Sequence, residues 1–184
     1  KQGKCWKLGI TICEDLWVDQ NMLSHRLNGP DPIAQLIPKN IDLLINLSAS
    51  PFSHSKDELR KHLAGEASKR LNCPVIYVNQ VGANDELVFD GSSFVLEKQN
   101  NLILQLPRCR ESLVVWDAAS KKQSQDIKPA NQMENLFEAL VLGVRDYAKK
   151  CGFDNALLGL SGGIDSALVA LIATSALGSQ NITA

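Results

Sequence analysis

The hydrophobic residues of this chain recur with two different periods. Leu8, Ile10 and Ile12 alternate with Lys7, Gly9 and Thr11, which predicts a half-buried strand that ends at Cys13. Continuous apolar stretches predict further strands at 41–46, 74–79, 92–97, 102–106 and 113–116. Asp90-Gly91 and Asn100-Asn101 are typical of turns between the later strands.

A helical period appears in three other segments. Ser55-Lys56-Asp57-Glu58 has the form of a capping box, and a stripe of apolar residues follows it at Leu59, Leu63, Ala67 and Leu71. A second helix is predicted from Gln132 to about Gly152, with its apolar face at Met133, Phe137, Leu140, Val141, Val144 and Ala148. A third follows residue 163 and ends at Gly178, and residues 19–38 are predicted to be a loop with one helical turn.

The order of these elements predicts an α/β fold in two domains. Strand, helix, strand and then hairpin-like strands indicate a mixed sheet with helices on one face over residues 1–117. Residues 118–131 are polar and aperiodic, so we interpret them as a linker. Residues 132–184 begin a second domain. Only one strand is predicted there, so we expect that domain to be truncated.

The charge balance and the lack of a long apolar run argue against two classes of partner, nucleic acids and membranes. Among the 184 residues, 19 basic and 20 acidic side chains leave a net charge of −1, which argues against nucleic acid as a partner. No apolar run approaches the roughly 20 residues that span a bilayer, so we expect no membrane contact and a cytoplasmic protein. The five cysteines lack disulfide or zinc spacing and are predicted to be reduced thiols, mostly buried. Neither the cysteines nor His25, His54 and His62 form a metal-binding set.

The segment at 159–166 is suited to binding phosphates. It joins the apolar run 156–160 to the apolar run 167–173, so it lies between a strand and a helix. Gly162 and Gly163 let the backbone approach an anion, Ser161 and Ser166 can donate hydrogen bonds, and the helix start supplies free N–H groups. The segment is neither a Walker loop nor a dinucleotide fingerprint. The structural alternative is a tight turn with Asp165 or Ser166 as the helix N-cap.

Cys13 is the candidate nucleophile. It follows directly on the first predicted strand, and side chains at the carboxyl end of a strand lie where α/β sheets bind ligands. The alternative is a buried structural cysteine, which is the commoner case.

Three segments resemble the nitrilase superfamily, whose members hydrolyse amides and nitriles. They are residues 9–17, 46–51 and 85–94. Ser-Gly-Gly-Ile-Asp-Ser at 161–166 resembles the signature of the ATP pyrophosphatases, which split ATP between its α and β phosphates. The two together resemble the layout of the glutamine-dependent NAD synthetase family, from about Lys7 to the last residue. The resemblance implies the C-terminal part of an α-β-β-α sandwich, followed by the first helix, strand and helix of a Rossmann-like ATP-pyrophosphatase domain.

The resemblance also implies a reaction with two sites. In that family the first half releases ammonia from glutamine through a glutamate, lysine and cysteine triad. The second half adenylates deamido-NAD with ATP and Mg²⁺, and ammonia then displaces AMP to give NAD. The triad's glutamate and lysine lie upstream of the cysteine in the family, so this chain by itself is expected to be inactive. The family usually assembles, which implies a homo-oligomer.

The resemblance assigns residues to both sites. Cys13 matches the nucleophile that forms a thioester, and Glu14, Ser50 and Lys56 match glutamine contacts. The matching ATP-binding residues are Gly159, Leu160, Ser161, Gly162, Gly163, Ile164, Asp165 and Ser166. Asp165 is expected to cap the helix or to help hold Mg²⁺, and no residue is assigned as a direct metal ligand.

Lys56 is also singled out by its position. A cation in the first turn of a helix opposes the helix dipole, which makes sense if a carboxylate binds between the ammonium and the N–H groups. The alternative is a solvated surface lysine. We interpret Glu86 and Asp90 as turn formers, although the resemblance implies that their loop lies near the glutaminase pocket. We interpret Arg145-Asp146-Tyr147 as helix surface.

Two rival functions remain open at this point. A nitrilase-like amidase could be joined to another ATP pyrophosphatase, of the asparagine, GMP or argininosuccinate synthetase type. A non-catalytic scaffold copy is the other alternative.

Overall fold

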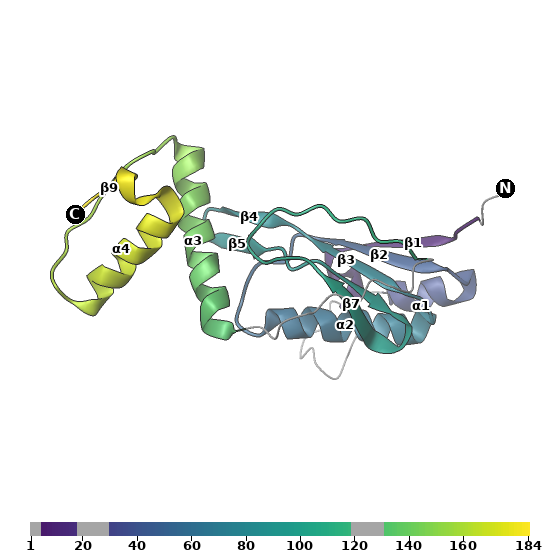
Figure 1. Ribbon diagram of the computed structural model, residues 1–184. Coiled ribbons are helices and arrows are strands. Elements are labelled where there is room, and N and C mark those ends of the chain that lie inside the picture. Colours follow the sequence, from purple (N-terminus) through teal and green to yellow (C-terminus); the bar gives the residue numbers. More distant parts are fainter. Residues whose placement is uncertain (1–4, 18–29, 119–130) are drawn as a thin grey trace.

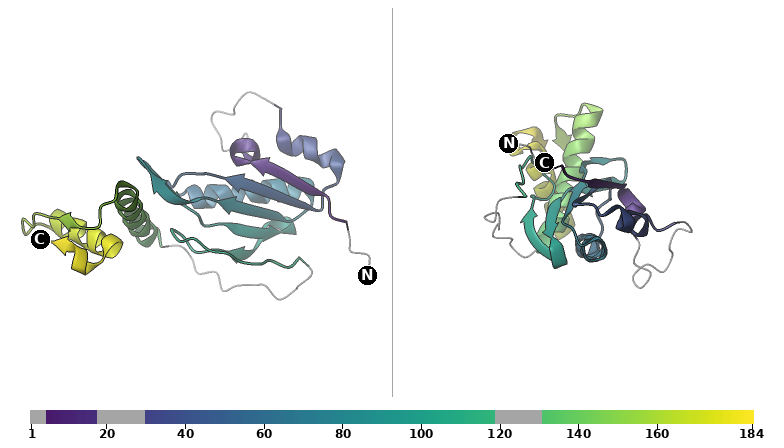
Figure 2. Two further views of the ribbon diagram at one scale, coloured as in Figure 1. Left: turned by 90° about the horizontal axis from the view of Figure 1, so that it is seen from above. Right: turned by 90° about the vertical axis from the view of Figure 1, so that its right-hand side faces the viewer.

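The computed structural model describes residues 5–17, 30–118 and 131–184. The molecule is elongated, with the N-terminal sheet at one end and the C-terminal helix at the other (Figure 1). The long helix α3 (Gln132–Cys151) stands between these two parts (Figure 2). Most of the predicted linker, residues 119–130, lies outside the described residues.

The larger part is built on one mixed sheet. Its strands lie in the order β1 (Leu8–Ile12), β2 (Leu43–Ser48), β3 (Val75–Asn79), β6 (Phe94–Glu97) and β7 (Asn101–Gln105). The first three are parallel, and β6 and β7 run antiparallel to their neighbours. Because parallel strands end at the same edge, the residues that follow β1, β2 and β3 come together.

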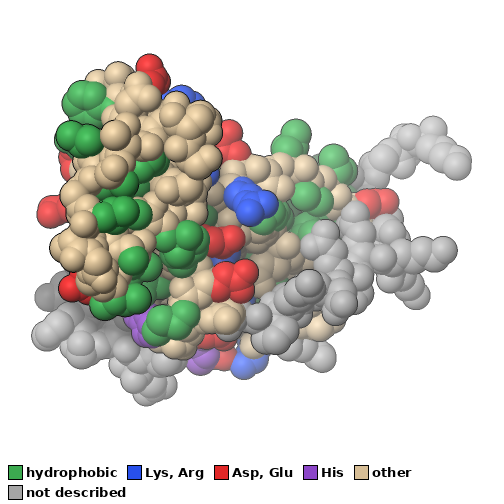
Figure 3. Space-filling view, turned by 60° about the vertical axis from the view of Figure 1, so that its left-hand side comes forward, with side chains coloured by type: hydrophobic (Ala, Val, Ile, Leu, Met, Phe, Trp, Pro, Cys, Tyr) green, Lys and Arg blue, Asp and Glu red, His purple; other side chains and the backbone are tan. Residues whose placement is uncertain are grey.

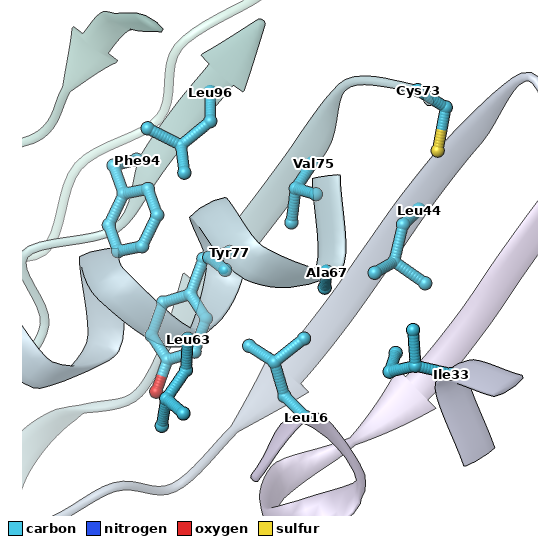
Figure 4. Close-up of a cluster of buried hydrophobic side chains, with 11 residues drawn as sticks. Leu16, Ile33, Leu44, Leu63, Ala67, Cys73, Val75, Tyr77, Phe94 and Leu96 are labelled. Atoms are coloured by element: carbon cyan, nitrogen blue, oxygen red, sulfur yellow. The ribbon is translucent and has the colours of Figure 1, made fainter. Parts of the chain in front are cut away.

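Helices cover one face of this sheet. They are α1 (Pro32–Leu36) and α2 (Lys56–Leu71). Short 3₁₀ turns lie in this part at Cys13–Leu16, Ile37–Lys39 and Lys98–Asn100, and another lies in the smaller part at Ser179–Asn181. The main core lies between α2 and the strands and contains Leu44, Leu63, Val75, Tyr77 and Phe94, among others (Figure 4). The rings of Tyr77 and Phe94 stack with centroids 5.0 Å apart. The predicted helical turn within 19–38 is confirmed for the described residues.

The apolar stripe on α2 is confirmed, but the capping box is wrong. Leu63 and Ala67 are buried, and Leu59 and Leu71 pack against the same core. Ser55 has a left-handed backbone with φ of 65° and makes no side-chain cap. The Ser55 carbonyl accepts the first helical bond from the Leu59 N–H at 3.3 Å, and the Lys56 N–H donates to the Ser53 carbonyl at 3.2 Å.

The strand at 8–12 is half-buried as predicted, but with the opposite face inward. Gly9 and Thr11 are buried, whereas Ile10 is 63% exposed. The reason is a close approach: a Cβ on Gly9 would lie 2.6 Å from the Ile41 side chain and 3.3 Å from Leu36. Only glycine leaves room for that packing.

The region between β3 and β6 differs from the prediction. Val81–Asn84 (β4) and Leu87–Asp90 (β5) form a separate antiparallel hairpin that the sequence analysis missed. Its turn is at Asp85-Glu86, so Glu86 is a turn residue as expected and Asp90 is not. No strand forms at 113–116, where Trp116 packs against the sheet through Val95, Ile103 and Leu104.

The smaller part contains β8 (Ala156–Leu157), α4 (Ile164–Leu177) and β9 (Ile182–Thr183). β9 pairs parallel with β8, so the expectation of a single strand is wrong. Hydrophobic side chains remain on the surface of this end of the molecule (Figure 3). Those of α4 include Ile164, Leu168, Val169 and Leu171, all about half exposed or more.

Helix α3 has the predicted bounds and a different buried face. Gly152 ends it in a left-handed conformation, as the sequence indicated. Ala148 of the predicted stripe is buried and Phe137 and Val141 are partly buried, but Met133, Leu140 and Val144 are exposed, and Ala139 and Leu142 are buried instead. The face is set by the β4–β5 hairpin, because Ala139 and Leu142 pack beside Val81, Val88 and Cys109.

All five cysteines are free thiols, but only Cys73 and Cys109 are buried, so the expectation that most are buried is wrong. Burial raises the pKa of the Cys109 thiol to about 12, with the Asp90 carboxylate adding to the effect. Among the described residues, none of the helices combines the length and apolar character needed to cross a bilayer.

Candidate functional site

Cys13 lies at the edge where β1, β2 and β3 end. It follows β1 directly and has a left-handed backbone with φ of 51°, a conformation that costs a non-glycine residue energy. Asn46, fully buried on β2, donates to the Thr11 hydroxyl at 3.0 Å and to the Cys13 carbonyl at 3.4 Å. The sharp turn is therefore held from the neighbouring strand, and it leaves the Cys13 side chain partly exposed.

Lys56 stands at the start of α2, near the same edge. Partial burial lowers the pKa of its ammonium, and the positive charge of Arg60 one turn later lowers it further. Cys13, Asp90 and Glu14 act on the Lys56 pKa in the opposite direction, so these groups share one electrostatic environment. The Lys56 Nζ also lies 5.4 Å from the ring centroid of Trp17.

Ser50 and Glu14 occupy different surroundings. Glu14 is exposed in the 3₁₀ turn that Cys13 begins. Ser50 is only 3% exposed, and its backbone N–H donates to Asn79 Oδ1 at 2.8 Å. The Ser50 hydroxyl accepts from Arg60 Nε at 3.1 Å. The structure thus brings Cys13, Glu14, Ser50 and Lys56 to one edge of the sheet.

The sequence analysis missed the residues beneath this edge. Arg60 and Asp90 form a buried ion pair with an NH1 to Oδ1 distance of 2.8 Å, so interpreting Asp90 as a turn former is wrong. Asn79, at the end of β3, links Ser50 to the Gly91 carbonyl. A signal for Arg60 was present: it falls on the same helical stripe as Ala64, Ala67 and Leu71, where a charged residue must find a buried partner.

The loop at 159–166 lies in the smaller part of the molecule and is solvent-exposed. Gly162 has φ of 82°, and a Cβ there or on Gly159 would meet nothing within 4 Å, so the backbone is open to a ligand. Ser161 and Ser166 hydroxyls lie 3.2 Å apart, and Ser166 donates to the Gly163 carbonyl at 2.9 Å.

Helix α4 starts beside these hydroxyls without a side-chain cap. The cap position is Gly163, so the interpretation of Asp165 or Ser166 as the N-cap is wrong. The first N–H groups of α4 are therefore available to an anion, and Asp165 lies exposed in the first turn.

Two of the three histidines lie in the part of the chain that the structure describes. His54 Nε2 lies 3.1 Å from Gln132 Oε1 at the start of α3. His62 lies on α2, and His25 is outside the described residues. Within the described ranges, no three His, Cys, Asp or Glu side chains gather in the way a metal site requires. Asp146 is not simple helix surface, because it accepts a hydrogen bond from the Ala83 N–H at 2.9 Å.

Comparison with known proteins identifies both parts. The carbon-nitrogen hydrolase family model matches residues 1–123, about two thirds of the chain. The chain belongs to the carbon-nitrogen hydrolase family. Residues 136–184 match the NAD synthase model, so the hydrolase domain is followed by the start of an NAD synthase domain. This confirms the predicted fold class, a nitrilase-like domain joined to part of an α/β NAD synthase domain.

Relatives with both domains cover the chain almost completely. The glutamine-dependent NAD(+) synthetase of Synechocystis is 48% identical over 181 residues, which are 96% of this chain and 32% of the relative. That of Rhodobacter capsulatus is 38% identical, over 95% of the chain and 31% of the relative. The glutamine-dependent NAD⁺ synthetase of Acinetobacter baumannii, solved in complex with ADP, superposes with a TM-score of 0.83 at 33% identity, over 100% of this chain and 35% of that one. The chain therefore spans about a third of the length of these relatives.

Proposed function

We propose that this chain is part of a glutamine-dependent NAD synthetase, in which the hydrolase domain releases ammonia at Cys13. The observation that supports this most directly is the placement of Cys13 in a strained turn at the edge of the sheet, within the electrostatic environment of Lys56. The Cys13 sulfur attacks the carboxamide carbon of glutamine, the C–S bond forms, and the C–N bond breaks to release ammonia. Water then cleaves the thioester to give glutamate and the free thiol.

The proposed glutamine contacts follow from charge and position. The Lys56 ammonium would hold the α-carboxylate, and Glu14 the α-ammonium. The Ser50 hydroxyl would donate to the substrate or to a water beside it. Lys56 is partly desolvated, which strengthens its attraction for a carboxylate. The same burial lowers the pKa of its ammonium, and a bound carboxylate would favour the charged form again.

The NAD synthase part would bind ATP on the loop at 159–166. Its open glycine backbone, the Ser161 hydroxyl and the uncapped start of α4 all favour an anion, which fits the β and γ phosphates. The Ser166 hydroxyl would join them by turning from the Gly163 carbonyl. The same donors would stabilise the departing pyrophosphate when the carboxylate of deamido-NAD attacks the α phosphorus. Ammonia from the hydrolase domain would then displace AMP and give NAD.

Magnesium fits this loop through Asp165. Mg²⁺ in nucleotide sites is commonly held by one or two carboxylates together with substrate phosphates, and the exposed Asp165 carboxylate is at the start of α4. The bound ion would neutralise phosphate charge. We also propose a homo-oligomeric, cytoplasmic enzyme, on the family resemblance and the near-neutral charge of the chain. The matching NAD synthase model favours this acceptor over those of other ATP pyrophosphatases.

The test is NAD formation by the full-length protein with two nitrogen donors. Cys13→Ala should abolish the glutamine-dependent rate and leave the ammonia-dependent rate unchanged, because only the first route uses the thiol. Both rates are measured with deamido-NAD and ATP at saturation. Cys151→Ala is the matched control, since Cys151 is an exposed thiol at the end of α3, and it should leave both rates unchanged. Equal loss of both routes in Cys13→Ala would refute the two-site assignment.

A further inference from the structure

Arg60 is the most completely buried charge in the part of the chain that the structure describes. It is 1% exposed and lies one helical turn after Lys56 on α2. All three guanidinium nitrogens donate: Nε to the Ser50 hydroxyl at 3.1 Å, NH1 to Asp90 at 2.8 Å, and NH2 to the Ser50 and Pro51 carbonyls at 2.8 and 3.0 Å. One side chain therefore fixes both the hydroxyl and the backbone of Ser50.

These bonds join three segments that are distant in sequence. The loop after β2 contributes Ser50 and Pro51, the end of β5 contributes Asp90, and α2 contributes Arg60 itself. Asn79 holds the same loop from the other side through the Ser50 N–H and carbonyl. The position of Ser50 relative to the first turn of α2 is thus set by Arg60 more than by local backbone preference.

The cost of burying Arg60 suggests a purpose beyond stability. A buried ion pair contributes little net stability compared with apolar residues of the same volume. Arg60 also places a second cation one turn from Lys56, which disfavours the charged form of that lysine. Apolar side chains of the same volume would stabilise this place at least as well as the ion pair.

One further buried polar group lies beside this cluster. The Tyr77 hydroxyl is buried and has no hydrogen-bond partner in good geometry among the described residues. Ser48, Ser50, Arg60 and Cys13 all affect its pKa, which burial raises above its ordinary value. The polar cluster beneath Cys13 thus keeps a donor for a bound molecule or water.

We propose that Arg60, anchored on Asp90, is a positioning residue for glutamine: it sets the spacing between Ser50 and Lys56 and so the affinity of the site for the amino acid. This rests on the proposed function. Arg60 does not touch the substrate, because it is covered by the loop it holds. Its fork of donors matters more than its charge, since four acceptor atoms on three residues must be met at once.

The test uses the full-length protein and the variant Arg60→Lys, which keeps the charge and removes the fork. We expect the KM for glutamine to rise by between about 10- and 100-fold, because a shift of about 1 Å in a positioning group has that effect. The ammonia-dependent rate should stay within twofold of wild type. A second readout needs no turnover: the glutamine concentration that half-protects Cys13 from iodoacetamide should rise by the same factor.

Two further variants sharpen the result. Asp90→Asn removes the anchor and keeps its shape, so it should raise both glutamine constants, and it replaces Arg60→Lys if that variant does not fold. Arg70→Lys is the matched control: Arg70 pairs with Asp31 at 2.5 Å, ten residues or about 15 Å further along α2. It should change neither constant.

The outcomes separate this proposal from the one it rests on. Unchanged glutamine constants in folded Arg60→Lys, with the glutamine route still dependent on Cys13, would overturn the role of Arg60 alone. Equal losses in both routes with a lowered melting temperature would also overturn it, since they indicate a structural residue. A glutamine route that survives Cys13→Ala would instead overturn the proposed function.

Discussion

At the scale of single residues, Asp57 shows how a buried charge can stabilise this domain. It is 8% exposed and accepts from the Ser92 hydroxyl at 3.0 Å, from Lys61 Nζ at 2.8 Å and from Arg108. Burial raises the pKa of its carboxyl, but the bonds and charges of Lys61 and Arg108 outweigh burial and leave the pKa below its ordinary value. Asp57 therefore links α2 to Ser92, which follows β5, and to Arg108, which follows β7.

Asp57→Asn should destabilise the protein by about 3 kcal/mol near neutral pH, because it removes the buried anion that pairs with the partly buried Lys61 and Arg108. The folded pKa lies below the unfolded one. The contribution is therefore present above the unfolded pKa of about 3.9 and is lost as pH falls through the folded pKa. Thermal unfolding of the full-length protein at several values from pH 7 to pH 3 should show the variant and wild type converging in acid.

Glu58→Gln is the matched control for Asp57. Glu58 approaches the same Lys61 at 3.6 Å, but its side chain is 75% exposed. Exposed pairs are worth little, so this variant should change the melting temperature hardly at all. A destabilisation equal to that of Asp57→Asn would show that burial is not the cause.

At the scale of elements, the strand–loop–helix unit at 156–177 depends on backbone conformation. Gly159 and Gly162 both have open space where a Cβ would lie, but only Gly162 has a positive φ, of 82°. A side chain at Gly162 would therefore strain the loop even though nothing blocks it, whereas one at Gly159 would not.

Gly162→Ala should weaken ATP binding by about tenfold, since the left-handed conformation costs an alanine roughly 1–2 kcal/mol. Gly159→Ala is the comparison, and it should change ATP affinity by no more than about twofold. Both are measured by isothermal titration of the full-length protein with ATP. Similar losses in the two variants would show that space, and not backbone conformation, limits the loop.

At the scale of the whole molecule, α3 fixes how the two parts meet. Asp146 accepts from the Ala83 N–H at 2.9 Å, Lys150 donates to the Ala83 carbonyl, and Arg145 reaches the Cys109 carbonyl at 3.5 Å. The apolar cluster of Cys109, Ala139 and Leu142 lies beneath these bonds. The helix that begins the NAD synthase part is thus packed on the β4–β5 hairpin of the hydrolase part.

Asp146→Ala should loosen this junction locally. The Ala83 N–H loses a bond to a charged acceptor, so amide exchange in the peptide 81–90 should accelerate about tenfold. Hydrogen exchange followed by mass spectrometry on the full-length protein measures this. Asp154→Ala, an exposed carboxylate just beyond α3, should leave that peptide unchanged. Unchanged exchange in Asp146→Ala would mean that the apolar cluster alone holds the helix.

The sequence by itself determined the parts of this protein that depend on local pattern. The stripe at Leu63 and Ala67 located α2, Gly152 marked the end of α3, and the segments around Cys13 and at 159–166 indicated the two chemistries. These features repeat or end within a few residues, so neighbours in the chain are enough to reveal them.

Only the tertiary structure decided which faces are buried and which charges meet. The alternation along β1 predicts that the Ile10 side chain and the Gly9 position face opposite sides of the sheet. Which of these faces is buried depends on Ile41 and Leu36, which pack against Gly9 although they lie more than twenty residues away in the sequence. Likewise, no local pattern pairs Arg60 with Asp90, which lie thirty residues apart. A buried charge needs a partner, but only the fold determines which residue that partner is.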